Sequence, residues 1–151
     1  MLPQTDARPS LQSAVYDRHL RLLSEAILRD DPQLARPFFF PMQAYEQVKA
    51  IEKPGRDWQV RLWKNFVRDV HEYHRLLGAN PERATIEKLE VREAGARWMK
   101  PQSEGNKLGY YRVTQSRLVG RKADGRPLGL DVTSMISWRG EWYVVHLHGF
   151  R

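Results

Sequence analysis

The spacing of the hydrophobic residues changes at Thr85, and this change restricts the possible folds more than any other feature of the chain. Before Thr85 the apolar residues recur at the helical period of about 3.6, and after it they alternate with the period of 2 that is typical of strands. Helices followed by strands define an α+β class, in which the helices pack on one face of an antiparallel sheet. We therefore expect N-terminal helices on a four-stranded C-terminal meander.

Two amphipathic patterns in the first half of the chain predict helices. The first pattern begins after Ser10, a residue type that caps helix N-termini, and ends near Asp30. The second pattern runs without interruption over residues 57–77 and ends at Gly78, which is typical of a helix C-terminus. We place residues 10–151 in one domain and expect residues 1–9 to form a flexible N-terminal segment.

The connection between these helices is rich in proline and aromatic residues. Residues 32–36 can form one short helical turn, because proline is tolerated at a first helical position. Phe38–Phe40 lies between Pro37 and Pro41, and three consecutive aromatic residues indicate a buried connection. Residues 45–51 fit either a strand or a second short helix.

Two glycine dipeptides predict where the strands turn back. Asp124-Gly125 and Arg139-Gly140 are typical of two-residue hairpin loops, so Ala123 should lie opposite Arg126 and Trp138 opposite Glu141. We predict four strands, which are separated by these two loops and by an earlier one. They cover about residues 85–94, 108–121, 127–138 and 141–150.

This register sorts the residues of the sheet onto two faces. The more apolar face is the expected helix-covered core, and the other face is mixed in polarity. On the mixed face Asp131 lies across from His148, an arrangement by which enzymes orient a general base, so these two residues are the candidate catalytic pair. The same pair is also typical of a surface contact or a dimer contact. The candidate ligand-binding or interface residues of this face are Tyr110, Arg112, Thr133, Trp142, His146 and Phe150.

Charge and composition narrow the range of partners. The chain has 25 basic and 18 acidic residues, a formal charge of +7 and a pI near 9.9, which suits an anionic partner. The charges are dispersed along the chain, so we do not expect nucleic-acid binding. No cysteine is present, which excludes disulfides and thiolate metal sites. No apolar run approaches the roughly 18 residues of a membrane span, so no membrane partner is expected.

No cofactor or metal site is predicted. His71 and His74 are three residues apart on the second helix, but they point toward different faces of it, and acidic ligands at a suitable spacing are absent. The glycines are scattered and form no phosphate-binding loop. The start of the chain lacks the apolar core of a leader peptide, which favours the cytoplasm unless a leader was removed beforehand.

Two stretches resemble the NTF2-like superfamily. The run from Ile27 to Ala35, with its acidic-proline step after a first helix, is similar to the opening of that fold. The run from Trp138 to His148 resembles the last hairpin of its SnoaL-like and calcium/calmodulin-kinase association-type branches. The uninterrupted helix at 57–77 departs from the family pattern, and no catalytic set of the family maps onto this chain.

The resemblance implies a cystatin-like cone of helices closed by a strongly curved sheet, with an apolar pocket between them and frequent dimerisation through the sheet. It does not name an activity, because the superfamily includes enzymes, transport factors and assembly domains. Two hypotheses follow. The first is a non-catalytic domain that binds a small apolar or anionic ligand or assembles as a homodimer. The second is an isomerase or dehydratase that uses Asp131 and His148 in an aromatic pocket. The direction in which the mixed face points distinguishes them.

Overall fold

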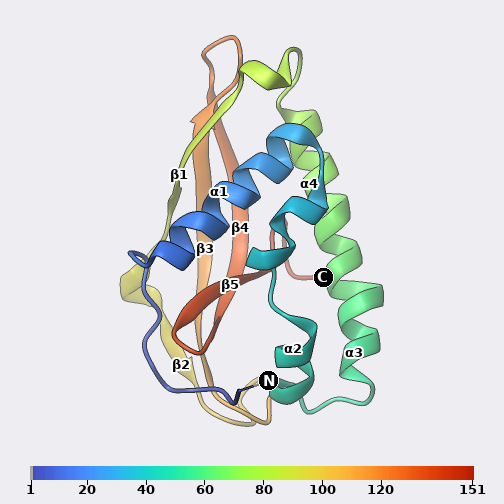
Figure 1. Ribbon diagram of the computed structural model, residues 1–151, viewed down its shortest axis with the longest axis vertical. Helices are drawn as coiled ribbons and strands as arrows, with labels where there is room; N and C mark the ends of the chain where they lie inside the picture. Colours follow the sequence, from blue (N-terminus) through green and yellow to red (C-terminus); the bar gives the residue numbers. More distant parts are fainter. Residues whose placement is uncertain (1) are drawn as a thin grey trace.

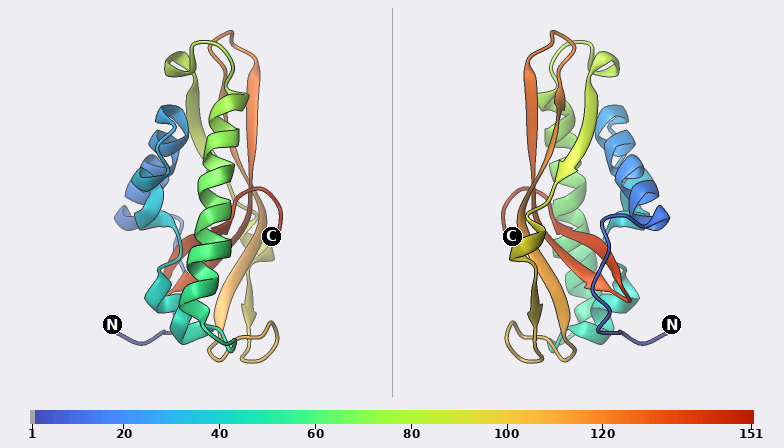
Figure 2. Two further views of the ribbon diagram at one scale, coloured as in Figure 1. Left: turned by 90° about the vertical axis from the view of Figure 1, so that its right-hand side faces the viewer. Right: turned by 90° about the vertical axis from the view of Figure 1, so that its left-hand side faces the viewer.

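The helices of the first half of the chain lie against a curled antiparallel sheet, a half-barrel that the second half forms (Figure 1). This computed structural model describes residues 2–151. Figure 2 shows that helices α1 (Ala14–Arg29) and α4 (Lys64–Leu76) lie on the same side of the long strands β3 (Tyr110–Arg121) and β4 (Pro127–Trp138). Helix α4 runs along the long axis of the molecule. The predicted α+β class, with N-terminal helices in a cone-like arrangement on the sheet, is confirmed.

Helix α1 spans Ala14–Arg29 and starts later than predicted. Its N-cap is Ser13, whose Oγ accepts the N–H of Tyr16 at 2.9 Å, and Ser10 lies outside the helix. Both serines are suitable caps, and Ser13 also donates to Glu141 on the sheet at 2.8 Å. This tertiary contact, which the local sequence does not contain, accounts for the choice between them.

The connection after α1 is helical and buried. A 3₁₀ helix covers Pro32–Phe38 and helix α2 covers Met42–Val48. Of the segment left open, residues 45–48 are therefore helical, and Lys49 forms an isolated β-bridge with Asn106. Phe38–Phe40 has at most 1% exposed surface, which confirms the predicted buried connection.

The long second helix is present and contains an unpredicted π-helical segment. Helix α3 covers Pro54–Asp57, the π-helical segment covers Trp58–Trp63 and helix α4 covers Lys64–Leu76. A π-helix places residues five apart above one another. Accordingly, the rings of Trp58 and Trp63 stack with centroids 5.7 Å apart and planes within 1°.

The sheet has five strands where four were predicted. Its order is β1-β3-β4-β5, and the short β2 pairs with β3 at the other end of that strand. The predicted strand at 85–94 ends early because a 3₁₀ turn follows it, and the last strand ends at His146 instead of residue 150. The strands are β1 Thr85–Glu90, β2 Arg97–Met99, β3 Tyr110–Arg121, β4 Pro127–Trp138 and β5 Glu141–His146.

The β3–β4 hairpin has a different loop from the one predicted. The Gly125 N–H donates to the carbonyl oxygen of Lys122 at 2.9 Å, and the Lys122 N–H donates to that of Arg126 at 2.9 Å. Of the two residues Asp124 and Gly125, only Gly125 has a positive φ, at 87°. This is a type I turn followed by a glycine bulge, which uses three loop residues instead of two.

The longer loop shifts the register of β3 against β4 by one residue. Arg112 therefore lies opposite Ile136, and Leu118 lies opposite Leu130. Directly opposed residues share a face of the sheet, so the predicted division between an apolar core face and a mixed face is wrong.

The β4–β5 hairpin has the predicted two-residue loop. Arg139 and Gly140 both have positive φ, at 51° and 80°, and Trp138 lies opposite Glu141. Further along, a bulge shifts the pairing, so that His146 lies opposite Ser134 and not Thr133.

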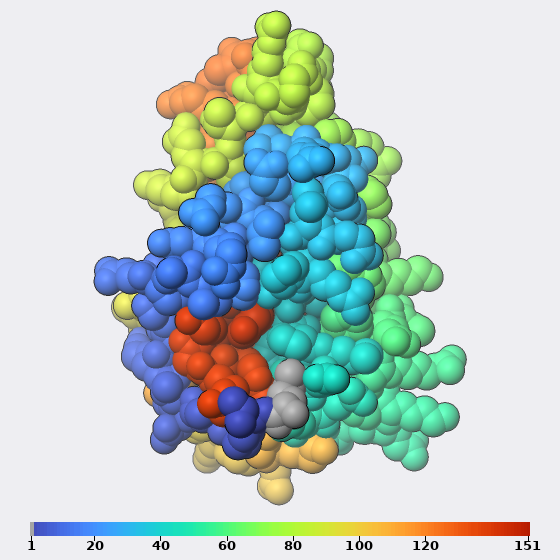
Figure 3. Space-filling view, in the orientation of Figure 1, coloured from blue at the N-terminus to red at the C-terminus, as the bar shows by residue number. Residues whose placement is uncertain are grey.

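The N-terminal segment lies against the sheet. The Gln4 amide donates to the carbonyl oxygens of Gly109 and Ser137, and its oxygen accepts the N–H of Arg139 at 2.8 Å. Figure 3 shows the tip of the β4–β5 hairpin bordered by α1 and this segment. The flexibility of residues 1–9 stays a prediction. Within residues 2–151, no helix has the length and apolar character that crossing a bilayer requires.

The loop geometry predicts a specific effect of substitution at Gly125. A Cβ there would meet no atom within 4 Å, so Gly125→Val acts through the positive φ alone. We expect it to lower the free energy of unfolding by about 1 kcal/mol or more in urea denaturation. Gly95→Val is the control, since Gly95 also has open space and does not have a positive φ. Equal costs at both positions would contradict the strain argument.

Candidate functional site

A cavity of about 190 Å³ lies between α2, the π-helical segment and the sheet. We call it the Lys49 cavity. Its apolar lining comes from Leu62, Ile136, Val145 and Phe150. Its polar lining comes from Tyr45, Lys49, Arg61, Glu104, Tyr110, Arg112, Ser134 and His146.

One group of polar side chains connects α2 with the long helix. Arg61 makes two hydrogen bonds to the carboxylate of Asp57, one turn earlier, at 2.8 and 2.7 Å. The hydroxyl of Tyr45 donates to the same carboxylate at 2.6 Å and accepts from Arg61 at 3.3 Å. The hydrogen bond from Arg61 is the main reason that the pKa of Asp57 lies below its usual value.

A second group connects α2 with the sheet and the loop before β3. The Lys49 amine donates to the hydroxyl of Tyr110 at 3.2 Å, and this hydroxyl donates to Glu104 Oε1 at 2.7 Å. The other oxygen of Glu104 accepts from the guanidinium of Arg112. These four side chains form a continuous hydrogen-bonded chain along one wall of the cavity.

Burial dominates the protonation behaviour of the lining. It lowers the pKa of Lys49, and the positive charges of Arg61 and Arg112 act in the same direction. It raises the pKa of Tyr45 and of Tyr110, so both phenols stay protonated at neutral pH. Burial, with smaller contributions from Arg61 and Lys49, lowers the pKa of His146 to about 4, so its imidazole is uncharged at pH 7.

The charges around the cavity do not balance. Arg61 is paired with Asp57 and Arg112 with Glu104, so each guanidinium has its own carboxylate. Lys49 has no carboxylate within ion-pair distance among residues 2–151, and it reaches Glu104 only through Tyr110. A protonated Lys49 would therefore leave one positive charge uncompensated in a partly buried site.

The structure brings together four of the candidate ligand or interface residues. Tyr110, Arg112, His146 and Phe150 all line the Lys49 cavity. Trp142 does not, because it is paired with Ser137 on the opposite face of β4 and is only 1% exposed.

Thr133 also lies away from the cavity lining. Its hydroxyl donates to the carbonyl oxygen of Leu147 at 2.7 Å and accepts the N–H of Gly149 at 2.8 Å. Thr133 therefore holds the segment that follows β5.

The predicted Asp131–His148 pair does not form. The carboxylate of Asp131 accepts from Arg117, directly opposite on β3, at 2.9 Å. His148 lies beyond the end of β5, where its ring packs against Tyr73 and its N–H donates to the buried Asp69 at 3.2 Å. The shifted register and the bulge in β5 separate the two residues.

Four polar residues in the hydrogen-bonded groups of the cavity were not among the candidate site residues. Tyr45 and Lys49 are four apart, the spacing of one helical turn, and this is the only local sign of a shared face on α2. Arg61 is one of several polar residues in the amphipathic pattern over residues 57–77, and Glu104 lies in an irregular loop, so neither has a distinctive local pattern.

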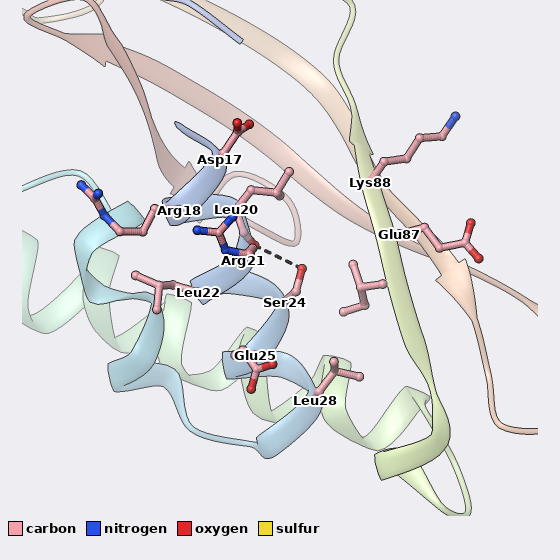
Figure 4. A pocket seen from close by; sticks show the side chains of 11 residues that line it. Asp17, Arg18, Leu20, Arg21, Leu22, Ser24, Glu25, Leu28, Glu87 and Lys88 are labelled. Carbon is pink, nitrogen blue, oxygen red and sulfur yellow. Dashed lines mark hydrogen bonds between the residues drawn. The ribbon is translucent and has the colours of Figure 1, made fainter. Parts of the chain in front are cut away.

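A larger hollow lies between α1 and β1, with a volume of about 670 Å³ (Figure 4). Its apolar residues include Leu20, Leu28 and Ile86. All its charged side chains are exposed, and Figure 4 shows Glu87 and Lys88 pointing away from α1. It is therefore an open surface groove without converging polar groups, and the Lys49 cavity is the better candidate site.

Neither a search for metal-binding groups nor comparison with known proteins assigns a function to the cavity. The part of the chain that the structure describes has no group of three or more histidine, aspartate or glutamate side chains that could hold a metal ion. Neither family models nor curated proteins nor solved structures match this chain. The resemblance to the NTF2-like superfamily therefore stays a prediction.

We expect Asp131→Asn to change the free energy of unfolding by less than about 1 kcal/mol, because exposed ion pairs contribute little. Both side chains of the Asp131–Arg117 pair are about half exposed. Urea denaturation of the parent and the variant measures the difference. A cost of several kcal/mol would show that the carboxylate has a structural role that its exposure does not indicate.

The half-buried His146 predicts a loss of stability in mild acid. Its pKa is about 4 in the folded protein against 6.5 for a free side chain, so its contribution is complete above pH 6.5 and is lost as the pH falls toward 4. Between pH 7 and pH 4 we expect the parent to lose about 2 kcal/mol more than His146→Gln. His148→Gln, at an exposed imidazole nearby, is the matched control. Parallel pH profiles for the parent and His146→Gln would contradict the assignment.

Proposed function

We propose that this protein binds a small ligand with one negative charge, and that a carboxylate fits the Lys49 cavity best. The observation that carries this proposal is the charge arrangement: two arginine–carboxylate pairs and one lysine without a carboxylate of its own. A bound monoanion would neutralise the remaining charge, and a charge-assisted hydrogen bond to a partly buried amine is among the stronger ones that proteins make.

The volume of the cavity restricts the size of the ligand. A space of 190 Å³ holds about six water molecules at roughly 30 Å³ each, so the ligand has roughly six to ten non-hydrogen atoms. Leu62, Ile136 and Phe150 offer apolar surface beside the polar wall. A short-chain carboxylic acid, with a charged head and an apolar body, matches both parts of the lining.

The enzyme hypothesis and the assembly hypothesis lose the sequence observations on which they rested. An isomerase or dehydratase based on Asp131 and His148 lacks its acid–base pair, since Asp131 bonds to Arg117. Assembly through an exposed sheet face relied on Trp142, which is buried within one chain. Self-association stays a prediction, and only Phe150, at 63% exposure, remains from the argument for it.

Isothermal titration calorimetry with butyrate tests the proposal. We expect the parent to bind butyrate, and Lys49→Met to weaken binding by about tenfold or more, because a charge-assisted contact of about 1.5 kcal/mol or more is lost. Lys107→Met is the matched control, since it removes the same charge from an exposed position in the segment beside Lys49.

The uncharged butyramide separates charge from shape. We expect it to bind much more weakly than butyrate to the parent and equally weakly to Lys49→Met. Equal affinities of the parent for the acid and the amide, or an equal loss in Lys49→Met and Lys107→Met, would contradict a carboxylate site at Lys49.

A further inference from the structure

We propose that the Lys49 amine is a nucleophile, which forms an imine with the carbonyl group of a small 2-oxo acid held in the Lys49 cavity. This inference rests on the proposed binding of a small carboxylate and adds a covalent step to it. It is carried by the position of the amine, the hydrogen-bonded chain behind it and the guanidinium groups beside it.

The backbone holds Lys49 firmly at the cavity wall. Its N–H donates to the carbonyl oxygen of Tyr45 at 3.0 Å, which closes the last turn of α2. It also forms an isolated β-bridge with Asn106, a buried residue. The amine lies over the ring of Tyr110, with 5.3 Å between Nζ and the ring centroid. A nucleophile needs this kind of fixed placement to meet a bound electrophile in a productive geometry.

The surroundings make it easier for the amine to lose its proton than for an exposed lysine. A lysine becomes nucleophilic when burial or neighbouring cations make its protonated form less stable. Both conditions apply at Lys49, because burial lowers its pKa and the positive charges of Arg61 and Arg112 lower it further. The negative charges of Glu104 and Asp57 raise the pKa of Lys49. The effect of Glu104 is smaller than that of burial but larger than that of either guanidinium.

The hydrogen-bonded chain offers a route for the proton that the amine must lose. Lys49 donates to the oxygen of Tyr110, and Tyr110 donates to Glu104 Oε1 at 2.7 Å. A proton can therefore pass from the ammonium to the phenol oxygen while the phenol passes its own proton to the carboxylate. Tyr110 is protonated before and after this transfer, as its raised pKa requires.

Arg112 offers a site for the ligand carboxylate. Its guanidinium lines the cavity and is the ion-pair partner of Glu104. The carboxylate of the incoming 2-oxo acid can compete with Glu104 for this guanidinium, because a guanidinium binds a planar carboxylate through two parallel hydrogen bonds.

The chemical step is balanced without an oxidant or a reductant. The lone pair of the neutral amine forms a bond to the carbonyl carbon, and the electron pair of the C=O π bond moves to the oxygen, which takes one proton from the nitrogen. The C–O bond of this carbinolamine then breaks, a C=N bond forms, and the oxygen leaves as water with both hydrogens of the amine.

Reductive trapping on the intact protein tests the inference. The parent is incubated with pyruvate and sodium cyanoborohydride, and the modified position is identified by peptide mass spectrometry. We expect one adduct, at Lys49, formed at least about tenfold faster than at any other lysine. Lys107→Met should keep this adduct, and Lys49→Arg, which keeps the positive charge, should lose it.

A variant of the proton route separates reactivity from binding. Tyr110→Phe keeps the ring beneath the amine and removes the hydroxyl, so we expect trapping to slow by about tenfold or more. The rates are compared at saturating pyruvate, so that a change in affinity caused by the lost hydroxyl does not affect the comparison. Equal trapping rates in the parent and Tyr110→Phe would remove Tyr110 from the proposed route.

The two proposals fail in different ways. Butyrate binding without a Lys49 adduct would overturn the imine and leave the carboxylate site in place. An even spread of adducts over exposed lysines would also overturn the imine. Absence of both butyrate binding and a Lys49 adduct would overturn both proposals together.

Discussion

The three phenylalanines of Phe38–Phe40 contact every layer of the domain. Phe38 packs against α1, Phe39 against the helix from Trp58 to Phe66, and Phe40 against the β4–β5 hairpin. Aromatic pairs of this kind contribute about 0.5–1.5 kcal/mol each beyond the area that they bury. The segment is a connection in the chain, but in the core it is the point at which α1, the long helix and the sheet meet.

The backbone of Phe40 also fixes both walls of the cavity. Its N–H donates to the carbonyl oxygen of Val144 at 2.9 Å, one residue before Val145 in the cavity lining. Its carbonyl oxygen accepts from the indole nitrogen of Trp58 at 2.7 Å, at the start of the π-helical segment that presents Arg61. The distance between the helical wall and the sheet wall therefore depends on a core contact that takes no part in the chemistry of the site.

The predicted strand register differs from the observed one by one residue at two places, and this explains how much of the candidate site could be predicted. The β3–β4 loop shifts one register by a residue, and the bulge in β5 shifts the next, so Arg112 and His146 again share a face. Trp142 lies before the bulge and faces the other way. Arg112 and His146 thus share a face as in the predicted register, with other β4 residues between them. Lys49 and Glu104 could not be found, because no sheet register connects them.

The sequence by itself determined the order and type of the main elements, which are the two long helices and the long strands of the sheet. The helical and alternating periods, the prolines at 37 and 41 and the two glycine dipeptides are local features, and each acts on its own few residues. The tertiary structure decided the choice of Ser13 as the cap, the register of β4, and the meeting of Lys49, Tyr110 and Glu104 in one chain of hydrogen bonds. These features depend on loop geometry and burial. A shift of one residue moves every side chain of a strand to the other face of the sheet, and the removal of water changes the pKa of a side chain. Both effects come from parts of the chain other than the residues that they change.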